Sequence, residues 1–147
     1  MGRGKKNIGS VRSANGDRDA VRRYWEDPNT RSIIDTNLHT IEIDTACRYL
    51  RKRDSVADIG CGNGIATVSY AKKALRCTGF ERSDHLRKQA IRNVKRSRLK
   101  NVEIQKGDIL TINKEAGRFD RIITQRVLIN LASWEEQKRA IMNVHGM

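Results

Sequence analysis

Residues 56–64 read Val-Ala-Asp-Ile-Gly-Cys-Gly-Asn-Gly, and the interpretation of the whole chain starts from this stretch. Its first four residues are typical of a short buried strand that runs into a turn. Gly60, Gly62 and Gly64 follow at alternate positions, and glycine is needed where φ is positive or where a ligand lies against the backbone. A strand, a glycine-rich turn and a helix beginning near Ile65 predict a nucleotide-binding corner.

The spacing of the glycines distinguishes between kinds of nucleotide site. The dinucleotide fingerprint G-x-G-x-x-G/A requires glycine or alanine where this chain has Ile65. The P-loop pattern requires a Lys-Ser or Lys-Thr pair after the turn, and none follows. The pattern present is D-x-G-x-G-x-G, with Asp58 two residues before the first glycine. It resembles the first motif of the Rossmann-like, class I S-adenosylmethionine-dependent methyltransferases.

Two later segments match this family in order. Residues 76–81 form a second predicted strand that ends in Glu81, whose carboxylate can accept hydrogen bonds from both ribose hydroxyls. Residues 101–109 form a third strand, and the family places near its end the acid that contacts the adenine amino group. Asp108 matches that acid, and an Asx turn that caps the next segment is the alternative. Ile109 either packs on the adenine or fills the core.

The fourth predicted strand covers residues 119–124, and Gln-Arg-Val-Leu-Ile-Asn-Leu at 125–131 matches the family's fourth motif. The resemblance extends over roughly residues 30–145. It implies an α/β, Rossmann-like parallel sheet with strand order 3-2-1-4, flanked by helices. The family's sheet has seven strands, so we expect a C-terminally truncated member whose later strands are missing. Strand four would then be an exposed edge through which the chain associates with itself or with a partner chain.

The resemblance also implies which residues bind S-adenosylmethionine. The amino-acid end of the cofactor would lie over the glycine turn, its ribose at Glu81 and its adenine near Asp108. Cys61 is expected to be a small turn residue, because nothing marks it as an activated thiolate. The full set of expected cofactor-binding residues is Asp58, Gly60, Cys61, Gly62, Asn63, Gly64, Glu81, Asp108, Ile109 and Gln125.

The catalytic residues cannot be assigned from the sequence. Gln125 and Arg126 are candidates because they follow strand four, where methyl group and acceptor meet. Arg126 would orient an anionic acceptor, and a surface arginine is the alternative. Three N-terminal residues are candidates for a lid over the cofactor, although a lid is the less favoured interpretation: Tyr24, Trp25 and Arg31. His39 and His85 are expected at the surface, since a general base would require a geometry that the sequence does not show.

Composition limits the class of protein. The 147 residues carry a net charge of +13, with 37% hydrophobic and 32% charged residues, which suits one soluble domain. No apolar run reaches the ~20 residues that cross a bilayer, and the N-terminus lacks a signal-peptide core. Three scattered cysteines fit reduced thiols and a cytoplasmic location. Three histidines without a ligand pattern predict no metal site.

Two regions are expected around the nucleotide-binding corner. Residues 1–22 form a basic tail that we expect to be disordered, and residues 23–147 form the S-adenosylmethionine-binding methyltransferase domain. An amphipathic helix is expected before strand one, and a second helix at 84–98 has a strongly basic outer face. The apolar residues of the first helix are Leu38, Ile41, Ala46, Tyr49 and Leu50.

The expected function is methyl transfer to a small-molecule acceptor, for which the positive charge favours an anion. A nucleic-acid acceptor is an alternative because of the basic charge. It is not favoured, since residues 124–127 lack the Asp/Asn-Pro-Pro-aromatic motif of amino-methylating enzymes. A non-catalytic cofactor-binding subunit or remnant that needs a partner is a second alternative, and a module for another adenosine cofactor such as NAD is a third.

Overall fold

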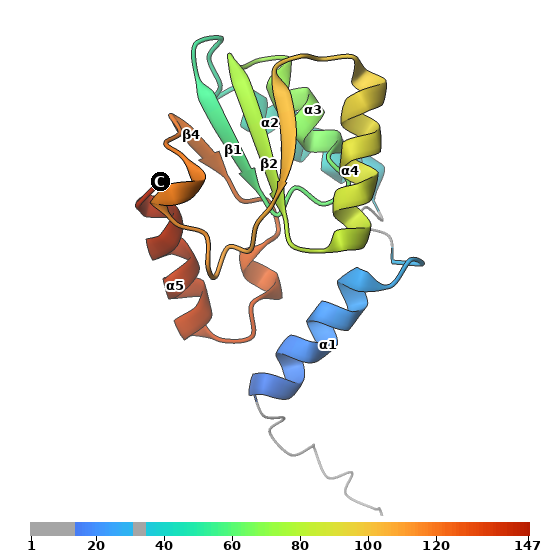
Figure 1. Ribbon diagram of the computed structural model, residues 1–147, viewed down its shortest axis with the longest axis vertical. Coiled ribbons are helices and arrows are strands. Elements are labelled where there is room, and N and C mark those ends of the chain that lie inside the picture. The colour runs from blue at the N-terminus through green and yellow to red at the C-terminus, as the bar shows by residue number, and fades with distance from the viewer. Residues whose placement is uncertain (1–13, 31–34) are drawn as a thin grey trace, which may run out of the picture.

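The structure is a computed structural model that describes residues 14–30 and 35–147 (Figure 1). Its centre is a four-stranded parallel sheet in the order β3-β2-β1-β4, which confirms the predicted topology. The strands are β1 (Ser55–Ile59), β2 (Arg76–Glu81), β3 (Val102–Lys106) and β4 (Arg121–Ile123). The helices are α1 (Ala14–Glu26), α2 (Thr36–Cys47), α3 (Ile65–Ala71), α4 (Asp84–Ser97) and α5 (Trp134–His145), with short 3₁₀ turns η1 (Lys114–Ala116) and η2 (Leu128–Asn130).

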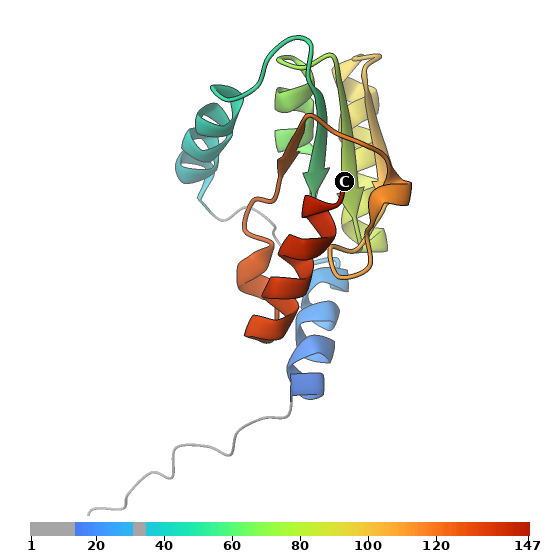
Figure 2. The ribbon, with the colours of Figure 1, turned by 90° about the vertical axis from the view of Figure 1, so that its left-hand side faces the viewer.

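Strand β1 lies in the interior of the sheet and is buried along its whole length. Its side chains alternate between the two faces, as in any strand. Val56 packs in a cluster with Ile43 of α2 and Tyr70 of α3. Ala57 packs in a second cluster that includes Ala140 of α5. Because both faces of a parallel sheet must be covered, α2 and α3 lie on one side and α5 on the other (Figure 2).

The helices begin and end at the signals that the sequence carries. Ser83 accepts a hydrogen bond from the Leu86 backbone nitrogen (3.2 Å) and so begins α4. Ser133 accepts from the Glu136 nitrogen (3.3 Å) and begins α5. The Glu136 carboxylate reaches back to the nitrogen of Ala132 (2.8 Å), one residue before the serine that a capping box would use.

The packed face of α2 differs from the expected one. Leu38, Ile41 and Tyr49 are exposed, and Ile43 is the buried residue of the helix. The face against the sheet consists of Ile43, Ala46, Cys47 and Leu50. These positions follow the helical spacing i, i+3, i+4, i+7. Ala46 and Leu50 were predicted correctly, whereas Ile43 and Cys47 pack in place of Leu38, Ile41 and Tyr49.

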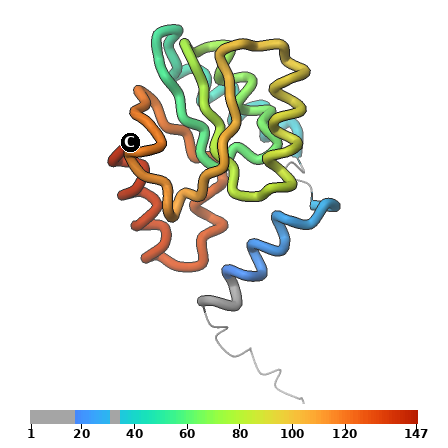
Figure 3. The backbone as a smooth tube through the Cα atoms, viewed as in Figure 1, coloured from blue at the N-terminus to red at the C-terminus, as the bar shows by residue number. Residues whose placement is uncertain are grey.

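Helix α1 begins within the region that the sequence assigned to a tail. Residues 14–22 form the first part of the helix, and residues 1–13 of that tail lie outside the described residues. The helix ends at Glu26, two residues before Pro28, as expected of a helix breaker. Helix α1 lies beyond the carboxyl ends of the strands (Figure 3). Within the described residues, no helix is both long and apolar enough to span a bilayer.

Candidate active site

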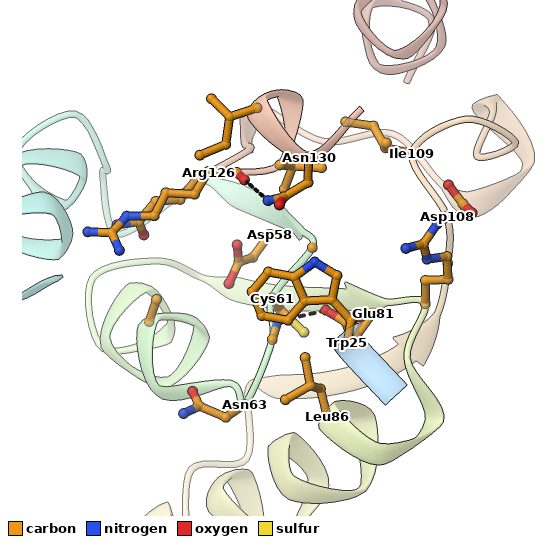
Figure 4. A pocket seen from close by; sticks show the side chains of 18 of the residues that line it. Trp25, Asp58, Cys61, Asn63, Glu81, Leu86, Asp108, Ile109, Arg126 and Asn130 are labelled. Atoms are coloured by element: carbon orange, nitrogen blue, oxygen red, sulfur yellow. Dashed lines mark hydrogen bonds and ion pairs between the residues drawn. The ribbon is translucent and has the colours of Figure 1, made fainter. Parts of the chain in front are cut away.

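A cavity of about 410 Å³ opens at the carboxyl ends of the strands (Figure 4). Its walls come from the turn after β1, the ends of β2 and β3, the segment after β4 and the last turn of α1. This is the place where open parallel α/β sheets bind ligands. All but one of the residues that the sequence predicted as cofactor contacts line this cavity, together with Arg126.

Gly64 is the exception, because it faces helix α4 and not the cavity. Its φ is 77°, and a Cβ at this position would lie 2.9 Å from Cβ of Ala90. The glycine therefore lets α3 and α4 approach closely at a left-handed backbone. Gly60 has a φ of 76°, and a Cβ there would collide with the side chain of Val127. The turn thus needs glycine at both ends for different reasons.

Glu81 ends β2, and its carboxylate is fixed from two sides. The backbone nitrogen of Gly62 donates to Oε2 (2.9 Å), and the nitrogen of Ser83 donates to Oε1 (2.7 Å). Glu81 is 8% exposed, and burial raises its pKa while these two hydrogen bonds act in the opposite direction. Each oxygen keeps a further lone pair, so the carboxylate can still accept hydroxyl donors at the cavity wall.

Asp58 lies at the cavity side of β1 and is almost fully buried, with 2% exposure. The hydroxyl of Thr67 donates to its Oδ2 (2.6 Å). Burial raises the pKa of Asp58 to about 7, and the neighbouring Glu81 carboxylate adds to the rise. Burial also raises the pKa of the Cys61 thiol, which is therefore held neutral within the turn.

Asp108 takes part in the Asx turn that the sequence left as an alternative. Its Oδ1 accepts from the nitrogen of Leu110 (2.9 Å), while Oδ2 lies 3.7 Å from the Arg82 guanidinium. Asp108 still lines the cavity, so capping the turn and facing a ligand are compatible roles. Ile109 belongs to the core cluster and also contributes to the cavity wall. Its carbonyl accepts from the Asn143 side chain (2.9 Å).

Gln125 and Arg126 are both held by Glu42 of α2. The Gln125 amide donates to Glu42 Oε2 (2.6 Å), and Tyr70 donates to the Gln125 Oε1 (3.2 Å). Arg126 binds the same carboxylate through Nε (3.0 Å) and NH2 (2.7 Å). Glu42 and Tyr70 were missed by the sequence analysis, because nothing local links α2 or α3 to the segment after β4. The positive charge of Arg126 is paired within the chain.

The last turn of α1 closes one side of the cavity through Tyr24 and Trp25. The Ser83 hydroxyl donates to the carbonyl of Trp25 (2.8 Å), which ties α1 to the start of α4. At the other end of the helix, Arg18 pairs with the buried Glu136 of α5. These contacts hold two of the three candidate lid residues, Tyr24 and Trp25, at the cavity wall. Arg31, the third candidate lid residue, lies outside the described residues.

The two histidines that the sequence considered as bases differ in position. His39 lines the cavity, and its pKa is lowered by burial and by the nearby Arg126 charge. Its ring therefore stays neutral to lower pH than a free histidine. His85 is not a lining residue, and its Nε2 lies 2.6 Å from the Gln89 amide nitrogen. Among the described residues, no group of acidic, histidine or cysteine side chains could hold a metal ion.

Comparison with known proteins gives the family. Residues 56–147 match the model of the methyltransferase domain family. The chain belongs to this family. Two curated methyltransferases are similar in sequence. The pavine N-methyltransferase of Thalictrum flavum is 25% identical over 76% of this chain and 32% of its own length. The ubiquinone biosynthesis O-methyltransferase of Coxiella burnetii is 34% identical over 52% of this chain and 32% of its own.

Solved structures show the same fold. The N-methyltransferase NodS of Bradyrhizobium japonicum, in complex with S-adenosylhomocysteine, has a TM-score of 0.68 at 21% identity. That likeness covers 87% of this chain and 65% of NodS. The phosphoethanolamine N-methyltransferase of Haemonchus contortus has a TM-score of 0.70 at 20% identity, over 92% of this chain and 30% of its own. This chain spans about a third of the length of the curated relatives.

S-adenosylmethionine is the cofactor of this family, and the described residues fit it. The glycine turn exposes backbone at the cavity wall, and Glu81 presents oxygens with unused lone pairs beside it. Asp58 adds a buried carboxyl group, and a positively charged ligand beside it would favour its ionised form. The cavity volume lies within the range of small-molecule sites.

Proposed function

We propose that this methyltransferase domain transfers the methyl group of S-adenosylmethionine to a small-molecule acceptor. The observation that carries the proposal is the Glu81 carboxylate, which two backbone N–H groups fix beside the glycine turn. A carboxylate fixed in this way can accept both hydroxyls of a ribose, and its place at the end of β2 suits a nucleoside. The reaction is displacement of the methyl group from the sulfonium by an oxygen, nitrogen or carbon nucleophile.

Within this proposal, the chain contributes alignment and exclusion of water more than covalent chemistry. The cofactor supplies an electrophilic methyl group that needs no activation, so the rate depends on the approach of the acceptor. Glu81 holds the ribose, and the turn at Gly62 fixes the neighbouring part of the cofactor. Asp58 would face the sulfonium group between the two parts of the cofactor. Trp25 covers the cavity from α1, and Val127 fills the space above Gly60.

The acceptor end of the cavity is formed by the segment after β4. Arg126 is engaged by Glu42, so it would orient an anionic acceptor only if that pair opens or shares its charge. His39 lines the same region with a lowered pKa, and as a neutral imidazole it can accept a proton from an acceptor hydroxyl or ammonium group. A small acceptor is further supported by the curated relatives, whose names specify N-methylation of pavine and O-methylation in ubiquinone biosynthesis.

The alternative functions can each be tested separately. A cofactor-binding subunit without catalysis would bind the cofactor and need a second chain. Strand β4 is the edge of the described sheet and offers a place for pairing, although its three residues begin with the exposed Arg121. Sedimentation of the pure chain over a concentration series decides whether it self-associates. Methylation of RNA, and a cytoplasmic location, likewise stay predictions.

The proposal is tested by calorimetric titration with S-adenosylhomocysteine, using NAD as the control ligand. We expect micromolar affinity for the first and none for the second. Glu81→Ala should weaken binding by about 1–3 kcal/mol, because buried hydrogen-bond donors of ligand and backbone lose their acceptor. Glu115→Ala is the matched control, since Glu115 is exposed in η1 and does not line the cavity. Unchanged affinity in Glu81→Ala would refute the ribose assignment.

A further inference from the structure

The net charge of this chain is concentrated at the end of the sheet that lies opposite the cavity. Because all four strands are parallel, the segments that enter them meet at one end, which is the upper end in Figure 1. Each of these four segments, taken together with the first residue of its strand, carries at least two basic residues. The exposed ones are Arg48, Arg51, Lys52 and Arg53 before β1, Lys72 and Lys73 before β2 with Arg76 as its first residue, Arg98 and Lys100 before β3, and Arg118 before β4 with Arg121 as its first residue. We call this set the amino-end basic face.

The amino-end basic face is not neutralised by its own acidic residues. Its four segments contain two of them, Asp54 and Asp120. Asp54 is 4% exposed, accepts from the Arg51 nitrogen (2.9 Å) and lies 3.7 Å from the Arg121 guanidinium. Asp120 accepts from the nitrogen (2.8 Å) and the hydroxyl (2.9 Å) of Ser55. Both carboxylates serve the local structure, so most of the basic side chains face solvent without a counter-charge.

We propose that the amino-end basic face binds the phosphate backbone of base-paired RNA. Lysine and arginine side chains that neutralise phosphates release counterions, and this supplies most sequence-independent affinity for nucleic acids. Arginine adds a planar fork that binds phosphate oxygens in pairs, and arginines outnumber lysines on this face. The last turn of α4 continues the face with Lys95 and Arg96, both exposed.

The scarcity of exposed aromatic residues on the face favours a duplex over a single strand. Single-stranded nucleic acid is bound by rows of aromatic side chains on which bases stack. Tyr49 is an exposed aromatic residue among the four segments, whereas Phe119 packs against Phe80 of the core. No helix projects from this end of the described chain, so nothing there would enter a major groove of DNA. Duplex RNA is recognised mainly through its shape and phosphates, which suits a face built of turns.

The face and the cavity lie at opposite ends of strands of five to six residues. At about 3.3 Å per residue, this separates them by roughly 17–20 Å. An RNA bound at the face is therefore held away from the methyl group. The bound RNA would localise the domain and would not be the acceptor of the methyl group. This inference is independent of the proposed function, because binding of RNA at the face needs no cofactor.

The test is fluorescence anisotropy of the full chain with a labelled 20-base-pair RNA duplex over a series of salt concentrations. We expect dissociation constants of about 1–100 µM near physiological salt and a steep loss of affinity as salt rises. The variant K72Q/K73Q removes two exposed charges from the face. It should weaken binding about tenfold and lower the slope of log affinity against log salt by about two.

A matched variant separates the face from the overall charge. K138Q/R139Q removes the same charge from exposed positions of α5 and should leave the slope unchanged. Equal loss of affinity in both variants, or no binding of the wild-type chain, would overturn the proposal. Binding of S-adenosylhomocysteine to K72Q/K73Q should stay at the wild-type level, so failure of the cofactor site is seen separately.

Three further ligands test whether the amino-end basic face prefers base-paired RNA to other polyanions. They are a DNA duplex of the same sequence, the single RNA strand, and vesicles of phosphatidylcholine with phosphatidylglycerol. We expect the RNA duplex to bind at least threefold more tightly than the others at equal salt. Equal or tighter binding of the DNA duplex, the single strand or the vesicles would overturn the assignment to base-paired RNA.

Discussion

The two ends of the same sheet are built on different principles. At the carboxyl end, the residues are glycines and buried acids, and each is fixed by contacts that the cavity needs, as in the hydrogen bonds of Gly62 and Ser83 to Glu81. At the amino end, exposed basic side chains gather in short turns with few partners. Substitutions at the first end should therefore change stability and cofactor binding strongly, whereas substitutions at the second should mainly change long-range electrostatics.

The largest effect is expected from Asp58, whose pKa is raised to about 7 by burial. The native state holds the proton of this carboxyl group more tightly than the unfolded chain, in which the pKa is about 4. Between these two values the native chain binds more protons, so the contribution of Asp58 to the free energy of unfolding falls as pH rises. The fall is on the order of 4 kcal/mol from pH 4 to 7 and is complete above pH 7.

Asp58→Asn removes this titration and keeps an oxygen to accept from Thr67. Chemical denaturation from pH 4 to 8 should show the variant gaining stability relative to the wild-type chain as pH rises. The sulfonium distinguishes S-adenosylmethionine from S-adenosylhomocysteine by one positive charge. The affinity for S-adenosylmethionine divided by the affinity for S-adenosylhomocysteine should rise with pH in the wild-type chain. In the variant this ratio should not change with pH. A flat ratio in both would mean that Asp58 does not face the sulfonium group.

Gly64→Ala should have the next largest effect. The added Cβ would lie 2.9 Å from Cβ of Ala90 and 3.0 Å from its Cα, at a backbone φ of 77°. Left-handed strain and overpacking against the backbone of α4 together should lower the free energy of unfolding by about 3 kcal/mol. Urea denaturation measures this. Gly146→Ala is the control, since a Cβ there meets nothing nearer than 3.6 Å, and we expect a change of less than about 0.5 kcal/mol.

The contrast between the two ends also explains what the sequence could predict. The turn at residues 60–64 and the carboxylate of Glu81 follow from short spacings along the chain. The strand order follows from the family resemblance, and the structure confirms it. Glu42 was not predictable, because it meets Gln125 and Arg126 across more than 80 positions of the chain. Its role depends on the rotation of α2 about its axis.

That rotation is the feature that local spacing predicted wrongly. The helix carries apolar residues on more than one side, and the choice between Ile41 and Ile43 depends on what covers the sheet. The first part of helix α1 was also not predicted from the sequence. Its residues 14–22 are mostly polar, and the helix is held by contacts with distant elements such as the Arg18–Glu136 pair. Contacts between distant elements thus limited prediction at both places.

Glu42→Gln is expected to have a moderate effect, and it probes the carboxyl end without touching the glycine turn. The variant loses the ion pair between Glu42 and Arg126. The side chain of Arg126 is 35% exposed and that of Glu42 is 28% exposed, so solvent screening keeps the loss of unfolding free energy to about 1 kcal/mol. The Glu42 charge raises the pKa of His39 while Arg126 lowers it. NMR titration of His39 should therefore show a lower pKa in the variant. Asp44→Asn on the same helix is the control and should leave the stability nearly unchanged.

The smallest effect on stability is expected at the amino end. In K72Q/K73Q, both side chains are exposed and the change in unfolding free energy should stay within about 0.5 kcal/mol. Its sign should be positive, since a chain of net charge +13 repels itself and loses part of that repulsion. Salt screens the same repulsion, so the difference from the wild-type chain should shrink between 20 and 300 mM salt, that is, from Debye lengths of roughly 20 Å to 6 Å. A destabilised variant would mean that these lysines hold the turn before β2 in place, and the amino end would then be structural in the same sense as the carboxyl end.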